Sequence, residues 1–349
     1  MNLENKRVLV TGGTGSLGQV LVRRILSGEM GRPAKVTVYS RDEAKQHYMR
    51  LDFMDKNTAT DEVIYENSHQ LLNFRIGDVR DYPAFCSVLR ESDIVFNAAA
   101  LKQVPTCEYA PFEAIQTNVY GANNLVRAIR ENKLDVETVV GVSTDKACKP
   151  INVMGLTKAL QERVLLEANR DCPDTKFVCV RYGNVIASRG SIVPLFVEQI
   201  KRGGPVTITL AEMTRFLLSL DRAVDTVFAA VKHGNAGDTF IPQVPAAKVT
   251  DIARALMYDK EVEMVYTGIR PGEKIHEIMV SEEEIFRTSE REGYYVIHSI
   301  LPDLRENEEN FKPALTKEYS SVDDNLAIPE LRELLQNASG EIALFKPQK

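Results

Sequence analysis

The stretch "VLVTGGTGSLG", residues 8–18, decides the fold of this chain. It begins with a short apolar run, which is typical of a buried strand. Three glycines follow at a regular spacing: Gly12, Gly15 and Gly18. The apolar residues after them fall on one helical face: Leu17, Val20, Leu21 and Ile25. Because such glycines let a backbone approach a pyrophosphate at the N-terminus of a helix, the stretch predicts a strand, turn and helix that bind a dinucleotide.

Further apolar runs alternate with segments of helical period along the first half of the chain. They are "KVTVYS" (35–40), "NFRIGDV" (73–79), "DIVFNAAA" (93–100), "TVVGVST" (138–144) and "KFVCVRYGNV" (176–185). Continuous runs of Val, Ile and Leu are typical of parallel strands that are buried on both faces. The alternation therefore predicts an α/β fold, with a Rossmann-type doubly wound parallel sheet.

The end of the second predicted strand chooses between the two nicotinamide cofactors. An acidic residue there holds a ribose 2′-hydroxyl, whereas a cation accepts a 2′-phosphate. Here Ser40 is followed by Arg41 and Asp42, and Lys45 comes one helical turn later. We therefore predict NADP rather than NAD. The predicted cofactor site contains Gly12, Thr14, Gly15, Ser16, Leu17, Gly18, Ser40, Arg41, Asp42 and Lys45, with Asp78 and Val79 near the adenine and Ala98 and Ala99 along the groove.

After about residue 185 the alternation loosens. Short apolar pieces, "VTIT" (206–209), "DTFIP" (238–242) and "EMVYTG" (263–268), lie among loops rich in Gly, Pro and charge. We predict an NADP-binding Rossmann domain over 1–185, with room for further core strands later in the chain. Residues 186–349 would form mainly a smaller C-terminal substrate-binding lobe and an extension. One apolar patch in that extension, residues 294–301, would cover the lobe or a neighbouring subunit.

Composition bounds the function. The chain has 349 residues, of which 44% are hydrophobic, and its net charge is −6. An acidic balance argues against nucleic acid as a partner. The first apolar run is too short for the core of a signal peptide, and no window is apolar enough to span a bilayer, so we expect a cytoplasmic protein without membrane contact. The five cysteines contain no CxxC pair and the five histidines are scattered, which predicts reduced thiols and no metal site.

Eight stretches together carry a family resemblance. They are "TGGTGSLG" (11–18), "SRDEAKQ" (40–46), "AAALKQVP" (98–105), "TNVYGANN" (117–124), "STDKACKPINVMGLTK" (143–158), "VRYGNVIASRGSIVPLF" (180–196), "MTRF" (213–216) and "GIRPGEKIHE" (268–277). With them the chain resembles the UDP-N-acetylglucosamine 4,6-dehydratases of bacterial capsule, O-antigen and flagellar-glycan pathways, which are extended short-chain dehydrogenases. "KEYSSVDDN" (317–325) is similar to the tail of the subgroup that inverts carbon 5.

The resemblance implies a reaction in which water is removed across carbons 5 and 6 of the sugar. NADP⁺ takes a hydride from carbon 4, the resulting ketone acidifies the carbon 5 proton, the 6-hydroxyl leaves, and the hydride returns to carbon 6. By this resemblance Asp145 and Lys146 form the acid–base pair of the elimination, and Thr144 meets the sugar 4-hydroxyl. Lys158 binds the nicotinamide ribose, Lys102 lies beside the cofactor and the sugar, and Asn118 lies beside the cofactor.

Position 154 departs from the family pattern. Most short-chain dehydrogenases have a tyrosine four residues before the lysine that corresponds to Lys158, and this tyrosine takes the proton of the 4-hydroxyl. Here the residue is Met154, whose thioether cannot do so. Methionine also occurs here in the inverting subgroup, so we expect an active enzyme in which Lys158, Lys146 or an ordered water relays the proton.

The substrate implied by the resemblance is UDP-N-acetylglucosamine or a related UDP-sugar. Arginine forks suit phosphate oxygens, which favours Arg215 and Arg270 as diphosphate ligands. Asn184 and the loop from Ser188 to Ser191 would also meet the diphosphate, and Glu273 the uridine ribose. The family forms hexamers or dimers, so a homo-oligomer is expected. Two alternatives stay open: a sugar-nucleotide 4-epimerase or ketoreductase on the same scaffold, and a non-catalytic nucleotide-binding subunit.

Overall fold

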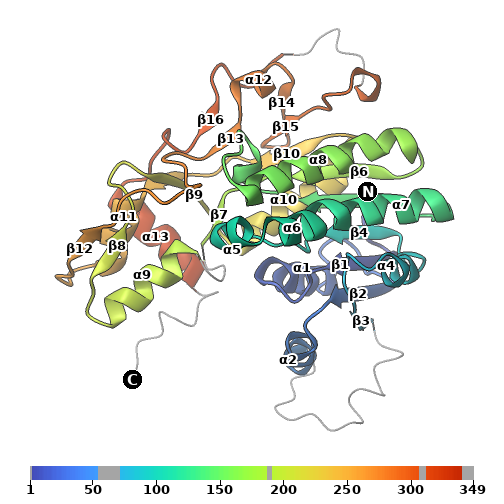
Figure 1. Cartoon of the computed structure of the whole chain (residues 1–349), viewed down its shortest axis with the longest axis horizontal. Coiled ribbons are helices and arrows are strands. Elements are labelled where there is room, and N and C mark those ends of the chain that lie inside the picture. Colours follow the sequence, from blue (N-terminus) through green and yellow to red (C-terminus); the bar gives the residue numbers. More distant parts are fainter. Residues whose placement is uncertain (1, 54–70, 187–190, 306–311, 340–349) are drawn as a thin grey trace.

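The core of the protein is a nine-stranded sheet with the strand order β14-β15-β10-β6-β5-β4-β1-β2-β3. The computed structural model, shown in Figure 1, describes residues 2–53, 71–186, 191–305 and 312–339. The strands of this sheet are β1 (Arg7–Thr11), β2 (Lys35–Ser40), β3 (Leu72–Ile76), β4 (Ile94–Asn97), β5 (Thr138–Val142), β6 (Lys176–Val180), β10 (Thr239–Pro242), β14 (Thr288–Arg291) and β15 (Tyr294–Ile297). All neighbours from β3 to β10 are parallel, and the β14–β15 hairpin adds to β10 in antiparallel fashion. The predicted α/β Rossmann-type fold is confirmed.

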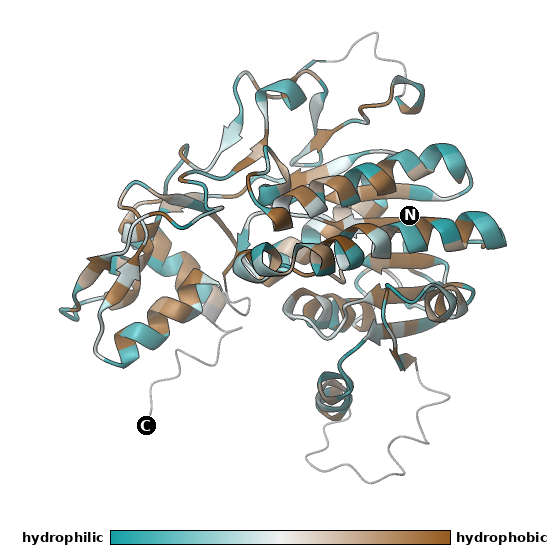
Figure 2. Ribbon diagram, viewed as in Figure 1, coloured by the Kyte–Doolittle hydropathy of each residue, from teal (hydrophilic) through white to brown (hydrophobic). Residues whose placement is uncertain are grey.

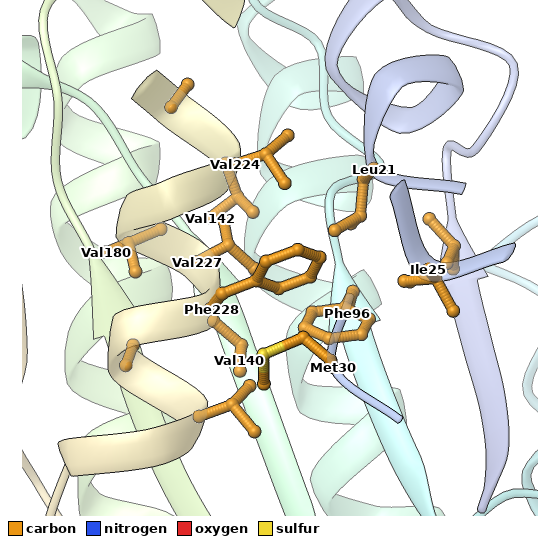
Figure 3. Packing of buried hydrophobic residues seen from close by; sticks show 14 of the residues in the cluster. Leu21, Ile25, Met30, Phe96, Val140, Val142, Val180, Val224, Val227 and Phe228 are labelled. Atoms are coloured by element: carbon orange, nitrogen blue, oxygen red, sulfur yellow. The ribbon is translucent and has the colours of Figure 1, made fainter. Parts of the chain in front are cut away.

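Helices cover both faces of the sheet. One face packs against α1 (Ser16–Leu26), α2 (Glu43–Phe53) and α10 (Leu220–His233), and the other against α4 (Tyr82–Leu89), α7 (Gly121–Asn132) and α8 (Val153–Asp171). Figure 3 shows the first of these layers, where Phe228 of α10 and Leu21 of α1 meet Phe96 and Val140 of the sheet. Parallel strands buried on both faces account for the continuous apolar runs in the sequence.

The order of the strands creates a groove at one edge of the sheet. The chain continues from β1 towards β2 and β3 on one side, then returns to place β4 on the other side of β1. Ligands of doubly wound sheets bind at such a switch point, outside the carboxyl ends of the strands. The loops after β1, β4, β5 and β6 all open at this edge, so the predicted cofactor and catalytic loops are brought together.

A smaller lobe lies beside the carboxyl ends of the strands. Its apolar core is formed by α9 (Ile192–Lys201), β8 (Val206–Ile208), α11 (Val249–Met257), β12 (Met264–Tyr266) and α13 (Ile328–Ser339). In Figure 2 these elements lie together beside the main sheet, and their ribbons carry brown, apolar residues alongside teal, polar ones. A three-stranded sheet joins the lobe to the core: β7 (Asn184–Val185), β9 (Thr214–Leu218) and β11 (Ala246–Lys248).

The remaining elements are short connections around the site. Between β4 and α7 lie α5 (Val104–Tyr109), α6 (Pro111–Ala114) and the π-helix η2 (Ile115–Tyr120), and after β5 comes the 3₁₀-helix η3 (Asp145–Ala147). Near the C-terminal end, β13 (Ile278–Val280) pairs with β16 (Tyr319–Ser320), while α12 (Glu282–Ile285) precedes β14 and η4 (Pro302–Leu304) follows β15.

Two segments from the second half of the chain lie in the main sheet. The sequence prediction leaves room for core strands after residue 185, and "DTFIP" is one of them, because it forms β10, the last parallel strand of this sheet. Tyr294–Ile297, from the apolar patch at residues 294–301, is strand β15 of the same sheet and so does not cover the lobe. A contact of this patch with a neighbouring subunit stays a prediction. Both segments are short, and they become strands only by pairing with neighbouring strands of the sheet. The division of the chain at residue 185 stays a prediction.

Within the described ranges, no helix is both long enough and apolar enough to cross a membrane. All five cysteines are buried free thiols. The same part of the chain shows no cluster of three or more His, Cys, Asp or Glu side chains that could hold a metal ion.

Candidate active site

A cavity of about 930 Å³ lies at the carboxyl ends of the strands, between the sheet and the smaller lobe. Nearly all the residues that the sequence predicts for the site line it: Gly12, Thr14, Gly15, Ser16, Leu17, Gly18, Ser40, Arg41, Asp42, Lys45, Asp78, Val79, Ala98, Ala99, Lys102, Thr144, Lys146, Met154, Lys158, Asn184, Ser191, Arg215, Arg270 and Glu273. Of the predicted residues that the structure describes, Asp145 and Asn118 do not line it. Segments far apart in the sequence thus converge on one space.

The glycine-rich turn forms a cradle without side chains. Gly12 has φ +66°, and a Cβ at this residue would lie 2.9 Å from the Cα of Ala99. At Gly18 a Cβ would come within 2.5 Å of the Cα of Gly13, so the helix packs closely on the turn. Gly15 caps α1 without a side-chain hydrogen bond, and the first turn of α1 has no acidic residue. The free N–H groups of that turn suit an anion such as the pyrophosphate of a dinucleotide.

Two cationic side chains that follow β2, Arg41 and Lys45, line the same cavity. Arg41 is half exposed and its guanidinium is 3.5 Å from the carboxylate of Asp78. Lys45 pairs with Asp42 at 2.5 Å, one turn into α2. Ser40 is buried and its hydroxyl accepts hydrogen bonds from Gln46 and Thr14. No carboxylate occupies the strand end itself, and the neighbouring Asp42 is already paired.

The loop after β5 carries a compact polar cluster. Asp145 is fully buried, and its Oδ1 accepts hydrogen bonds from Thr144 Oγ1 at 2.8 Å and from Lys146 Nζ at 3.1 Å. Its other oxygen, Oδ2, has no hydrogen-bond partner among the described residues. Thr144 and Lys146 reach the cavity wall, so Asp145 acts on the cavity through these two neighbours.

Lys146 Nζ contacts two further acceptors. Glu277 Oε1 lies at 3.1 Å and Asn184 Oδ1 at 3.2 Å. Burial lowers the pKa of Lys146, but the carboxylates of Asp145 and Glu277 more than offset this and raise it above its ordinary value. Sequence reasoning missed Glu277 as a site residue, although it ends the "GIRPGEKIHE" stretch on which the family resemblance partly depends.

The surroundings of Lys158 shift its pKa in the opposite direction from that of Lys146. Its Nζ is buried and donates to the backbone oxygen of Val142 and to Gln161 Oε1, the latter at 2.7 Å. Burial lowers its pKa to about 8, and Glu162 offsets this only in part. One turn earlier on α8, Met154 is 4% exposed and packs in an apolar cluster with Cys107 and Ala114. The position of the missing tyrosine therefore holds a side chain that cannot transfer protons.

Asn118 does not line the cavity but supports residues beside it through hydrogen bonds. Its side-chain amide exchanges hydrogen bonds with the backbone of Leu101 and donates to Thr157 Oγ1. Next to it, Thr117 Oγ1 is buried without a partner in the described structure, and so is Ser143 Oγ. Both residues line the cavity. Sequence reasoning did not select these two hydroxyls, since nothing in a lone Thr or Ser marks it as unpaired.

The lobe supplies the remaining charged side chains. Arg215 of β9 is nearly buried and donates to the backbone oxygens of Thr214 and Ile275. Arg270 is 56% exposed and lies 3.8 Å from Glu273, whose Oε2 has no hydrogen-bond partner among the described residues. Ser191 Oγ also lacks one. The predicted contacts of Ser188 to Gly190 fall on residues outside the described ranges.

Comparisons with known proteins agree with this architecture. Residues 8–299 match the model of a family described as "Polysaccharide biosynthesis protein". A protein of Rickettsia conorii named UDP-glucose 4-epimerase is 43% identical over 343 residues, which is 95% of each chain. A Rickettsia typhi protein of the same name is 42% identical over the same length and coverage.

Solved structures extend the comparison. Pen from Bacillus thuringiensis is 32% identical, with a TM-score of 0.84 over 97% of this chain and 100% of that one. DesIV, a dTDP-glucose 4,6-dehydratase of Streptomyces venezuelae solved with NAD and TYD, is 20% identical, with a TM-score of 0.64 over 77% of this chain and 86% of that one, and so supports the fold alone. The chain belongs to the polysaccharide biosynthesis protein family and has the extended short-chain dehydrogenase/reductase fold.

Proposed function

We propose that this protein is an NADP-dependent 4,6-dehydratase of UDP-N-acetylglucosamine that inverts carbon 5. Its product would be a UDP-linked 4-keto-6-deoxy-N-acetylhexosamine for surface polysaccharide synthesis. The observation that carries the proposal is the Thr144–Asp145–Lys146 cluster, whose hydroxyl and ammonium line the cavity while a fully buried carboxylate links them. Hydride transfer alone does not need such a pair, whereas elimination of water needs both an acid and a base.

The chain's own groups match the steps of that reaction. A bound NADP⁺ supplies the hydride acceptor for carbon 4 and later the donor for carbon 6. Thr144 would orient the sugar 4-hydroxyl, because its own proton is directed at Asp145 Oδ1. In the elimination, the Lys146 ammonium would protonate the departing 6-hydroxyl, and the carbon 5 proton would pass to the Asp145 carboxylate through the Thr144 hydroxyl, since Asp145 itself does not line the cavity. Arg215 and Arg270 would bind the diphosphate from the lobe side of the cavity.

The first proton acceptor is assigned to Lys158. Met154 cannot accept a proton, and the pKa of Lys146 is raised, so Lys146 holds its proton at neutral pH. Burial lowers the pKa of Lys158 to about 8, so this amine can lose its proton close to neutrality. A neutral amine still donates to Val142 and Gln161 and keeps a lone pair, with which it would accept the 4-hydroxyl proton directly or through a water.

The proposal that the cofactor is NADP rather than NAD rests on Arg41. This half-exposed guanidinium lines the cavity at the end of β2, where a 2′-phosphate would lie, and among the described residues it has a 3.5 Å contact with Asp78. Structural neighbours such as DesIV were solved with NAD, which makes the comparison of the two cofactors necessary. Fluorescence titration should show tighter binding of NADP⁺ than of NAD⁺, and Arg41→Ala should remove most of the difference. A wild-type protein that prefers NAD⁺ would contradict the assignment.

A second candidate function is 4-epimerisation of a UDP-hexose, since the Rickettsia relatives carry the name UDP-glucose 4-epimerase. Product mass separates the two reactions. Incubation with UDP-N-acetylglucosamine and NADP⁺ should give a product lighter by one water. An isomer of unchanged mass, from this sugar or from UDP-glucose, would favour the epimerase. A homo-oligomer, dimer or hexamer, in the cytoplasm remains our expectation for the working protein.

A further inference from the structure

Glu277 lies far in sequence from the Asp145–Lys146 pair and yet lines the same cavity. Its side chain is 1% exposed, and Oε1 lies 3.1 Å from Lys146 Nζ. The other oxygen, Oε2, is buried and has no hydrogen-bond partner in the described residues. A carboxylate buried in this way is costly unless its charge is compensated, and here the nearest compensation is the ammonium of Lys146.

We propose that Glu277 is a positioning residue of this site, which together with Asp145 fixes Lys146 at the cavity wall and keeps it protonated in the free protein. Only the consequence for turnover rests on the proposed dehydratase function. The placement of Lys146 and its protonation can be tested without any sugar.

The geometry supports a fixed ammonium. A lysine ammonium has three N–H donors and no acceptor. Nζ of Lys146 has three acceptors within 3.2 Å: Asp145 Oδ1, Glu277 Oε1 and Asn184 Oδ1. Two of the three are carboxylates from separate segments, the loop after β5 and the residue just before β13. Lys146 is therefore clamped from both sides and cannot turn out of the cavity without losing a charged partner.

The charges around Lys146 come from each segment packed against it. Asp145 and Glu277 are negative, while Arg215 of β9 and Lys274 of the loop before β13 are positive. Arg215 Nε is 3.9 Å from Glu277 Oε1, and the Lys274 ammonium donates instead to the backbone oxygen of Cys148. Burial lowers the pKa of Lys146 and Arg215 adds to this effect, but the two carboxylates more than offset both. Without the charge of Glu277, the Asp145 carboxylate would have to oppose by itself the effects of burial and of the two cations on the pKa of Lys146.

The test measures the reactivity of Lys146 itself. Wild-type protein, Glu277→Gln and Glu277→Asp are acylated with acetic anhydride at pH 8, and peptide mass spectrometry gives the rate at each lysine. Only the neutral amine reacts, so the rate reports the neutral fraction. Losing one carboxylate partner should lower the pKa by about 1–3 units and raise the Lys146 rate roughly ten-fold or more in Glu277→Gln. Glu277→Asp keeps the charge and should stay closer to the wild type.

Lys149 and Glu282 provide the matched control. Lys149 lies three residues from Lys146 and pairs with Glu282 and Glu318 on the surface. Glu277→Gln should not change the Lys149 rate, and Glu282→Gln should not change the Lys146 rate. Equal Lys146 rates in wild-type and folded Glu277→Gln protein would overturn the proposal. Should Glu277→Gln fail to fold, Glu277→Asp still decides: its longer contact should give a measurably faster Lys146, and a rate equal to wild type would overturn the proposal.

Turnover then separates this inference from the proposed function. Glu277→Gln should lower kcat at least ten-fold and move the pH profile of kcat towards lower pH, which a merely structural role would not do. If wild-type protein dehydrates the sugar while Lys146 labelling is the same in Glu277→Gln, the inference alone fails. If labelling responds as expected but no dehydration occurs, the proposed function alone fails.

Discussion

Residue 154 is where this chain differs most clearly from the tyrosine-bearing short-chain dehydrogenases. Met154 lines the cavity but is packed against Cys107 and Ala114, so its role is to fill space. We expect Met154→Leu, which conserves volume, to keep kcat within about two-fold and to cost little stability. Met154→Tyr should retain or raise kcat, because it adds a proton carrier beside Lys158. Loss of turnover in either variant, with a wild-type melting temperature, would contradict the assignment of the first proton acceptor to Lys158.

Lys158 gives the site a pH dependence with a definite sign. Burial lowers its pKa to about 8, and the proposed relay needs the neutral amine. The value of kcat/KM should therefore rise as the pH increases through about 8, because kcat/KM reports groups of the free enzyme. A steady-state profile between pH 6 and 10 measures this. A rate that falls through pH 8 would show that Lys158 must be cationic, as expected if it only binds the nicotinamide ribose.

Among the elements, the turn between β1 and α1 serves both the packing of α1 and the proposed binding of the dinucleotide. Substitutions at two of its glycines should affect these two roles separately. A Cβ at Gly18 would lie 2.5 Å from the backbone of Gly13, whereas at Gly15 the nearest atom is Gly12 O at 3.2 Å. Gly18→Ala should destabilise the protein by about 1–3 kcal/mol, as overpacking does. Gly15→Ala should melt within a few degrees of wild type but weaken dinucleotide binding. Thermal unfolding and cofactor titration check both, and equal melting temperatures for the two variants would contradict this division.

The strands of the parallel core could be predicted because strands that are buried on both faces consist of nearly continuous apolar residues. "VTVY" and "VVGV" are mainly apolar, and all of their residues are buried in β2 and β5. The hairpin of β14 and β15 could not be predicted in this way. β14 reads "TSER", and its residues become a strand only by pairing with β15 at the sheet's edge. Short edge strands of this kind depend on tertiary contacts rather than on local pattern.

The same limit applies to the site. The glycine turn, Thr144 to Lys146 and Lys158 lie in contiguous motifs, so the resemblance found them. Glu277 is brought to Lys146 only by the packing of the lobe against the sheet, over a separation of more than a hundred residues. The unpaired hydroxyls of Ser143 and Thr117 are likewise visible only once their surroundings are known. Sequence motifs therefore pointed to the residues that we propose to react, and the fold shows what surrounds them.

At the scale of the whole molecule, Arg181 ties the sheet to the C-terminal segment. This buried guanidinium pairs with Glu162 of α8 at 2.8 Å and with Glu284 of α12 at 2.9 Å. Burial raises the pKa of Glu284, but Arg181 more than offsets this and lowers it to about 2. Since the pKa is depressed in the folded state, the stabilisation is complete above pH 4.5 and is lost as the pH falls towards about 2.

Glu284→Gln should therefore lower the free energy of unfolding by about 3 kcal/mol at pH 7, and the difference from wild type should shrink below pH 4. The glutamine keeps the capping position of α12, so the change removes mainly the charge. Glu282→Gln, on the exposed side of the same helix, should cost less than about 1 kcal/mol. Urea unfolding at pH 7 and pH 3 measures both. A Glu284 effect that does not depend on pH would contradict the ion-pair explanation.

A proton NMR time course in D₂O, with purified protein, UDP-N-acetylglucosamine and NADP⁺, distinguishes dehydration from epimerisation by its products. We expect a new 6-methyl signal, deuterium at carbon 5, ring couplings that show inversion there, and no net consumption of cofactor. Conversion to a 4-epimer without a methyl signal would contradict this expectation, and so would the absence of any change while the nucleotide sugar still binds.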